Sequence, residues 1–297
     1  MPNRYFFTGD GFVKQKWQSH AWAGLMAAAF LAVPLNTQAQ EPAAATADSE
    51  PQYPLAVAVA GPKLMVVDLD LPGVWLVEQE RTLMAAGSKL LRKPMNRPRC
   101  IVALTDGSAL VGDSATREIY LVTTDGEPKP LTNGYLGIPM AMAVAPDGKT
   151  VYIGDAEKRA TFRMPIEGGK PELVARVNAR GLAFDGEGNL WAVTPDDAAI
   201  KKINVESNEV EDVITGRPYQ YPNGLAWAGD HGYVTDGYGK TIWKFTADGK
   251  TEKWHEGEPL IGPVGIAVDE KSVYVADPKQ KQVFQFDRES KEVTERL

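Results

Sequence analysis

The sequence predicts an all-β protein, a six-bladed β-propeller of four-stranded antiparallel blades. A short apolar strand that ends in an acid recurs six times, at steps of 39 to 45 residues, with threonine replacing the acid once. A second phrase of small apolar residues, usually introduced by proline, opens each repeat. Four short strands with tight turns occupy about 40 to 45 residues, which is the length of one propeller blade.

The recurring strand ends suggest a structural role for their side chains. An Asp that ends a strand commonly accepts hydrogen bonds from backbone N–H groups of the following loop. Because every repeat carries the position, we interpret it as a shared structural device and not as a ring of acid/base catalysts. The six positions are Asp68, Asp113, Asp155, Thr194, Asp236 and Asp277.

The opening phrases predict the innermost strands, where Ala and Gly allow six strands to converge. They begin near Pro54, Pro98, Pro139, Ala179, Pro222 and Pro263. Third strands alternate polar and apolar residues, which is typical of a sheet packed against a neighbouring sheet. Glycine supplies positive φ in the expected third-to-fourth turns at Asp125-Gly126, Gly168-Gly169 and Asp248-Gly249.

The N-terminal residues resemble an export signal. Residues 21–35 are uncharged, and this stretch is too short for a typical membrane-spanning helix and contains Pro34. We expect residues 1–39 to be a signal peptide, 40–52 a flexible linker and 53–297 the propeller. The protein is then secreted or periplasmic, with no membrane span after signal removal; an uncleaved signal anchor is the alternative.

Composition excludes several functions. A net charge of −7 and a pI near 5.2 argue against nucleic-acid binding, which needs a clustered basic surface. The single Cys100 permits no intramolecular disulfide and no cysteine-based zinc site. His20 lies in the signal, and neither His231 nor His255 is expected at the channel mouth, so a Ser-His-Asp triad or a histidine-based lyase site has no candidates.

The phrase Pro222-Asn223-Gly224-Leu225-Ala226, followed by Val-x-Asp at Asp236, resembles the NHL-repeat and regucalcin/gluconolactonase-like superfamily of propellers, over residues 53–297. The resemblance implies that the Asn223 side-chain oxygen binds a divalent metal. The superfamily's other ligand positions fall on Val264, Arg180 and Arg99, and these residues cannot hold Ca²⁺ or Zn²⁺. We therefore expect no cofactor, with a metal at Asn223 as the alternative.

Arg99 and Arg180 stand two blades apart at the expected channel mouth, where guanidinium groups can bind carboxylate, phosphate or sulfate. Aromatic loop residues on the same side suit sugars or peptide surfaces. The candidate ligand-binding set is Arg99, Arg180, Asn223, Tyr221, Tyr238 and Tyr135, with Tyr219 nearby. The competing interpretation is that both arginines form ion pairs with the strand-end acids.

No complete catalytic set can be assembled from these residues. The sequence therefore favours a non-catalytic binding module whose partner is an anionic small molecule, a glycan or a protein. The alternative is a metal-dependent lactonase or esterase of the gluconolactonase-like type, with Asn223, Asp236 and Thr194 as a degenerate metal site. Whether an exchanged strand closes the ring is left open.

Overall fold

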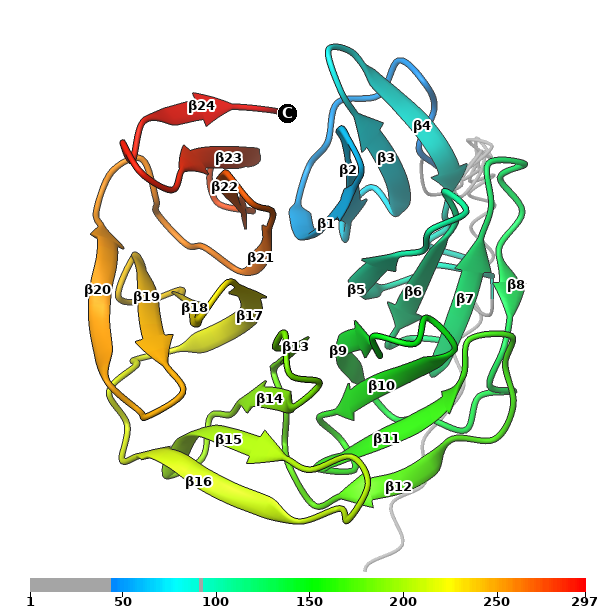
Figure 1. Cartoon of the computed structure of the whole chain (residues 1–297). Coiled ribbons are helices and arrows are strands. Elements are labelled where there is room, and N and C mark those ends of the chain that lie inside the picture. Colours follow the sequence, from blue (N-terminus) through cyan, green and yellow to red (C-terminus); the bar gives the residue numbers. More distant parts are fainter. Residues whose placement is uncertain (1–43, 91–92) are drawn as a thin grey trace, which may run out of the picture. The chain divides into compact units, whose positions relative to one another are not determined.

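A computed structural model describes residues 44–90 and 93–297, and the expected signal peptide lies outside these residues. Within them, six four-stranded antiparallel sheets form a ring, which confirms the six-bladed propeller (Figure 1). Each blade consists of four strands consecutive in sequence. No helix in the described part of the chain has the length and apolar character needed to cross a membrane.

The strands of the first three blades are β1 Pro54–Ala60, β2 Lys63–Asp68, β3 Gly73–Val77 and β4 Arg81–Ala86; β5 Pro98–Ala103, β6 Ala109–Asp113, β7 Glu118–Val122 and β8 Lys129–Pro130; and β9 Pro139–Val144, β10 Thr150–Asp155, β11 Ala160–Pro165 and β12 Glu172–Ala175. Those of the last three are β13 Gly181–Phe184, β14 Leu190–Val193, β15 Ala198–Ile203 and β16 Val210–Thr215; β17 Pro222–Ala228, β18 His231–Asp236, β19 Thr241–Thr246 and β20 Thr251–Glu256; and β21 Gly265–Val268, β22 Ser272–Asp277, β23 Gln282–Asp287 and β24 Val293–Glu295.

The innermost strands β1, β5, β9, β13, β17 and β21 surround the centre of the ring (Figure 1), and their small residues are required by close approach. A Cβ on Gly181 would lie 2.4 Å from the backbone nitrogen of Leu225 in the next blade. A Cβ on Gly265 would lie 2.7 Å from the Cα atom of Ala56. Larger residues at these glycines would force neighbouring blades apart.

The strand-end acids have the structural role expected from their repetition. Asp277 is fully buried, and its two carboxylate oxygens accept four backbone N–H groups, from Ile261, Gly262, Lys279 and Gln280. The other strand-end acids bind the loop entering their own blade and, in each case, a backbone N–H after the strand. These carboxylates therefore tie together the two loops that form one face of each blade.

Thr194 takes the acid's place in the fourth blade, as the sequence predicts. Its hydroxyl donates to the Ala198 carbonyl at 2.7 Å and accepts the Asp196 backbone N–H at 3.1 Å. A hydroxyl makes fewer hydrogen bonds to loop backbone groups than a carboxylate, so the side chain at this position holds the loops of the fourth blade with fewer bonds.

The apolar core lies mainly between adjacent blades, and the same kind of packing closes the ring. Val57 and Trp75 of the first blade share one cluster with Tyr274 and Val283 of the last. Arg296 also donates from Nη2 to the Glu78 carbonyl at 3.0 Å. Among the described residues each sheet keeps its own four strands, so closure uses side-chain packing and not an exchanged strand.

The start of the packed domain differs from the expectation of a flexible linker over residues 40–52. Ala45 is 5% exposed and packs in the cluster that joins the first and last blades. The Gln52 backbone N–H donates to Asp68 Oδ2 at 2.6 Å, and Glu50 pairs with Arg81 at 3.0 Å. The Ala- and Pro-rich composition of the segment gave no sign of these contacts, which depend on the fold of the ring.

Candidate functional site

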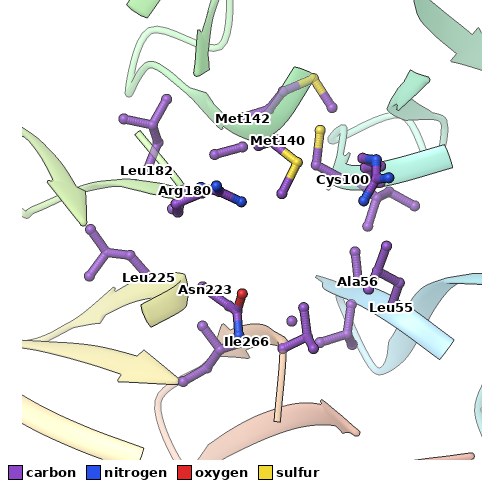
Figure 2. Close-up of a pocket in the computed structure, with 18 of the residues that line it drawn as sticks. Leu55, Ala56, Cys100, Met140, Met142, Arg180, Leu182, Asn223, Leu225 and Ile266 are labelled. Atoms are coloured by element: carbon purple, nitrogen blue, oxygen red, sulfur yellow. The ribbon is translucent and has the colours of Figure 1, made fainter. Parts of the chain in front are cut away.

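The six entry positions of the innermost strands meet around one central cavity of about 250 Å³. They are Leu55, Arg99, Met140, Arg180, Asn223 and Val264. Figure 2 shows side chains from several blades directed toward this space, with the nitrogen atoms of Arg180 reaching into it. The ring geometry thus brings Arg99, Arg180 and Asn223 to one cavity, as the repeat phase predicts.

Arg99 is held in place by a neighbouring hydroxyl. Its Nε donates to Ser114 Oγ at 2.9 Å, and Ser114 Oγ in turn donates to the Arg97 carbonyl at 3.2 Å. The pKa of Arg99 lies below its ordinary value, chiefly because of burial and further because of the positive charges of Arg97 and Arg180. The cations around this cavity therefore repel one another, and a bound anion would relieve the repulsion.

Arg180 enters the cavity without a partner for part of its guanidinium group. Its Nε is buried and makes no hydrogen bond to the described residues. Arg180 also lines a smaller cavity of about 80 Å³ between the fourth and fifth blades, and this cavity shares Arg180 and Tyr221 with the central one. Because protein atoms cover Nε, the terminal nitrogens of this guanidinium group are the donors that a ligand oxygen in the cavity can contact.

The competing interpretation, in which these arginines form ion pairs with the strand-end acids, is wrong for the described residues. Within residues 44–90 and 93–297, no ion pair includes Arg99 or Arg180. Asp113 and Asp236, which end strands near the two arginines, accept backbone N–H groups instead. No Asp or Glu among the described residues lines the central cavity.

Asn223 faces the cavity through its amide oxygen. Its Nδ2 lies 3.3 Å from both the Tyr221 carbonyl and the Pro263 carbonyl, which fixes the orientation of the amide. Figure 2 shows the oxygen directed toward the channel and the nitrogen directed away from it. The site therefore combines cationic donors with one neutral acceptor.

These residues do not fit a divalent metal. Asn223 supplies a single neutral oxygen, whereas Ca²⁺ and Zn²⁺ require several oxygen or nitrogen ligands. Asp236, which the lactonase interpretation needs, accepts the backbone N–H groups of Gln220, Tyr221 and Gly239. The described residues contain no cluster of His, Cys, Asp and Glu suited to a metal, and the charged residues among them that line the cavity are arginines.

The tyrosines predicted at the mouth separate into three environments. Tyr221 lines the cavity, and its ring stacks on Tyr238 with centroids 4.7 Å apart. Tyr238 does not line the cavity and is 67% exposed. Tyr135 lies away from the cavity, with its ring against Phe162 and the Lys158 ammonium 4.0 Å from the ring centroid. Tyr219 is buried, and burial raises its pKa to about 12.

Tyr53 and the apolar walls are the main features that sequence reasoning missed. Tyr53 lines the cavity from the position that Tyr221 occupies in the fifth blade. Both tyrosines precede a proline that opens an innermost strand, so the shared Tyr-Pro phrase could have revealed Tyr53. Met140 and Met142 also line the cavity, and apolar strand residues of this kind carry no signal that separates a wall from a core.

Comparison with known proteins finds no matching family model and no match among curated proteins. Solved structures share the fold at low sequence identity. A chain of the nidogen/laminin complex is 18% identical with a TM-score of 0.66, covering 79% of this chain and 92% of that one. A virginiamycin B lyase from Staphylococcus aureus is 15% identical with a TM-score of 0.64, covering 85% and 87%. A gluconolactonase from Xanthomonas campestris is 15% identical with a TM-score of 0.64, covering 79% and 86%. These likenesses agree with the sequence resemblance at the level of the fold.

Proposed function

We propose that this protein is an exported ligand-binding propeller whose channel mouth binds an anionic small molecule. The observation that carries the proposal is the pair of arginines that face one cavity and have no carboxylate partner among the described residues. Figure 2 shows nitrogen atoms of Arg180 reaching into the cavity, and Arg99 is oriented by Ser114. Guanidinium groups bind planar anions through pairs of N–H donors, and such charge-assisted bonds are strong where water is limited.

A binding role accounts for the site better than hydrolysis does. The metal-dependent lactonase alternative needs acidic or amide ligands around Asn223, but arginines and an aliphatic residue occupy those positions. Asp236 and Thr194 are engaged in loop hydrogen bonds. The Asn223 oxygen serves in this proposal as a hydrogen-bond acceptor for the ligand.

The proposal is tested by thermal unfolding with a panel of anions, including acetate, phosphate, sulfate and glucuronate. At least one anion is expected to raise the unfolding temperature of the parent protein and to lose this effect in the Arg99→Gln/Arg180→Gln variant. Arg163→Gln is the matched control, because Arg163 lies on β11 and pairs with Glu172 at 3.5 Å. Equal stabilisation of the parent and the double variant by every anion would contradict the site.

Export is tested separately by fractionation and intact-mass measurement. We expect the protein outside the cytoplasm with an N-terminus at Gln40, after the Thr37-Gln38-Ala39 phrase. Retention of residues 1–39 in the mature protein would contradict this part of the proposal.

A further inference from the structure

We propose that the cavity selects a monocarboxylate with an apolar body about the size of one substituted ring. This inference rests on the proposed anion site and specifies its ligand. Its basis is the contrast between the two arginines at the entrance and the remaining lining, in which most side chains are apolar.

The apolar side chains that line the cavity disfavour binding of a strongly hydroxylated ligand. Met142, Leu182, Leu225 and Ile266 are each at most 8% exposed, and all four line the space (Figure 2). Sugar hydroxyl groups placed against these side chains would lose their hydrogen bonds to water without finding protein partners. An aromatic or branched aliphatic group would instead remove apolar surface from water at the same place.

The arginines favour a carboxylate as the ligand's charged end. Protein atoms cover the Nε of Arg180, whereas Figure 2 shows nitrogen atoms of this guanidinium group reaching into the cavity, so its two terminal nitrogens can donate in parallel to two oxygens of one planar group. The Nε of Arg99 is occupied by Ser114, which leaves its terminal nitrogens as donors. No Asp or Glu of the described residues lines the cavity, so no carboxylate from these residues competes with the ligand's carboxylate for the two arginines there.

Asn223 adds a requirement for one donor on the ligand. Its Nδ2 is committed to two backbone carbonyls, so its exposed Oδ1 can only accept. A hydroxyl or amide N–H near the carboxylate satisfies this oxygen. The volume of about 250 Å³ lies just below the range of about 300–1,000 Å³ that is typical of small-molecule pockets, which suits one ring with a short side chain.

Isothermal titration of the purified protein with five probes tests this selectivity. The probes are 3-phenyllactate, 3-phenylpropanoate, 3-phenylpropanamide, glucuronate and inorganic phosphate. Phenyllactate is expected to bind most tightly and phenylpropanoate more weakly, because the latter lacks the hydroxyl for Asn223. The neutral amide is expected to bind at least 10-fold more weakly than phenylpropanoate, because hydrogen bonds to charged groups are the stronger ones.

Single substitutions test the arginine end and the apolar wall of the cavity separately. Arg180→Gln is expected to weaken phenyllactate binding by about 10- to 100-fold and to reduce the preference for acid over amide, with Arg99 supplying what remains. Met140→Gln keeps side-chain length but makes the wall polar, so it is expected to weaken the phenyl compounds and not phosphate. Arg163→Gln is the control, and circular dichroism verifies that each variant is folded.

The outcomes separate this inference from the proposal beneath it. Arginine-dependent binding of phosphate or glucuronate without binding of the phenyl acids would overturn the apolar-body inference and retain the anion site. Equal affinity for phenylpropanoate and its amide would overturn the carboxylate assignment. Absence of binding by every anionic probe would overturn both proposals.

Discussion

The buried Asp277 offers a quantitative test of how the blades are held together. Its Oδ2 accepts the N–H groups of Ile261 and Gly262 at 2.7 and 2.8 Å, and its Oδ1 accepts those of Lys279 and Gln280 at 3.1 and 3.3 Å. In Asp277→Asn, either orientation of the amide places an NH₂ donor against two backbone donors. The substitution preserves shape, so the loss of stability reports on these bonds.

Two bonds to a charged acceptor are lost, at about 1.5–3 kcal/mol each before relaxation. Relaxation of the loops reduces this sum, and we expect the free energy of unfolding to fall by about 3 kcal/mol. A change of that size lowers the unfolding temperature by about 6–12 °C in a domain of this size. It is also a large fraction of the typical 5–15 kcal/mol that stabilises a folded protein.

Urea unfolding followed by tryptophan fluorescence measures this loss. Asp197→Asn is the matched control, because the Asp197 side chain is 91% exposed and pairs only at the surface with Arg217. The control is expected to change the free energy of unfolding by less than about 0.5 kcal/mol. If Asp277→Asn is no more destabilising than this control, the carboxylate-to-loop bonds do not hold the blade together.

Three further predictions address the N-terminal segment, the cationic mouth and the buried thiol. Ala45→Glu is expected to lower the free energy of unfolding by about 1–3 kcal/mol, because it places a charge where Ala45 packs. Ala44→Glu is the control and is expected to leave the free energy of unfolding unchanged, because Ala44 is exposed. Equal urea midpoints for the two variants would show that the segment is not packed. Without ligand, Arg180→Gln is expected to leave the unfolding temperature unchanged or raise it at low salt, because it removes repulsion with Arg99; a clear decrease would indicate a structural role. Burial raises the pKa of the Cys100 thiol to about 12, so the folded protein is expected to react slowly with a disulfide reagent at pH 8. Its free energy of unfolding is expected to fall as pH rises from about 9 toward 12, because the unfolded thiol loses its proton in that range before the folded one does. Fast reaction without unfolding would contradict the burial of the thiol.

The spacing of the repeats, and the position of each phrase within a repeat, made most of the architecture predictable from sequence. A period near 40 residues sets the number of blades, and the inner-strand phrase identifies which residue of each blade reaches the mouth. Arg99, Arg180 and Asn223 could be placed at one opening for this reason, although they are separated by 81 and 43 residues. The acids at the strand ends were interpretable because a structural device repeats whereas a catalytic group does not.

The remaining features depend on distances that a repeat pattern does not contain. Tyr135 and Tyr221 both precede inner strands, but Tyr135 packs on Phe162 at the side of a blade while Tyr221 lines the cavity. The partners of the arginines could not be inferred either. Whether an acid is free to pair depends on the backbone N–H groups that already occupy it, as they do at Asp113.

A crystal structure with 3-(4-bromophenyl)lactate tests the central claim most directly, because anomalous scattering locates the bromine independently of the rest of the ligand. We expect the carboxylate within hydrogen-bond distance of the terminal guanidinium nitrogens of Arg99 and Arg180, and the bromine deeper among Met142, Leu182 and Leu225. Bromine density on the exposed Tyr221–Tyr238 pair, with both guanidinium groups free of ligand, would contradict the account.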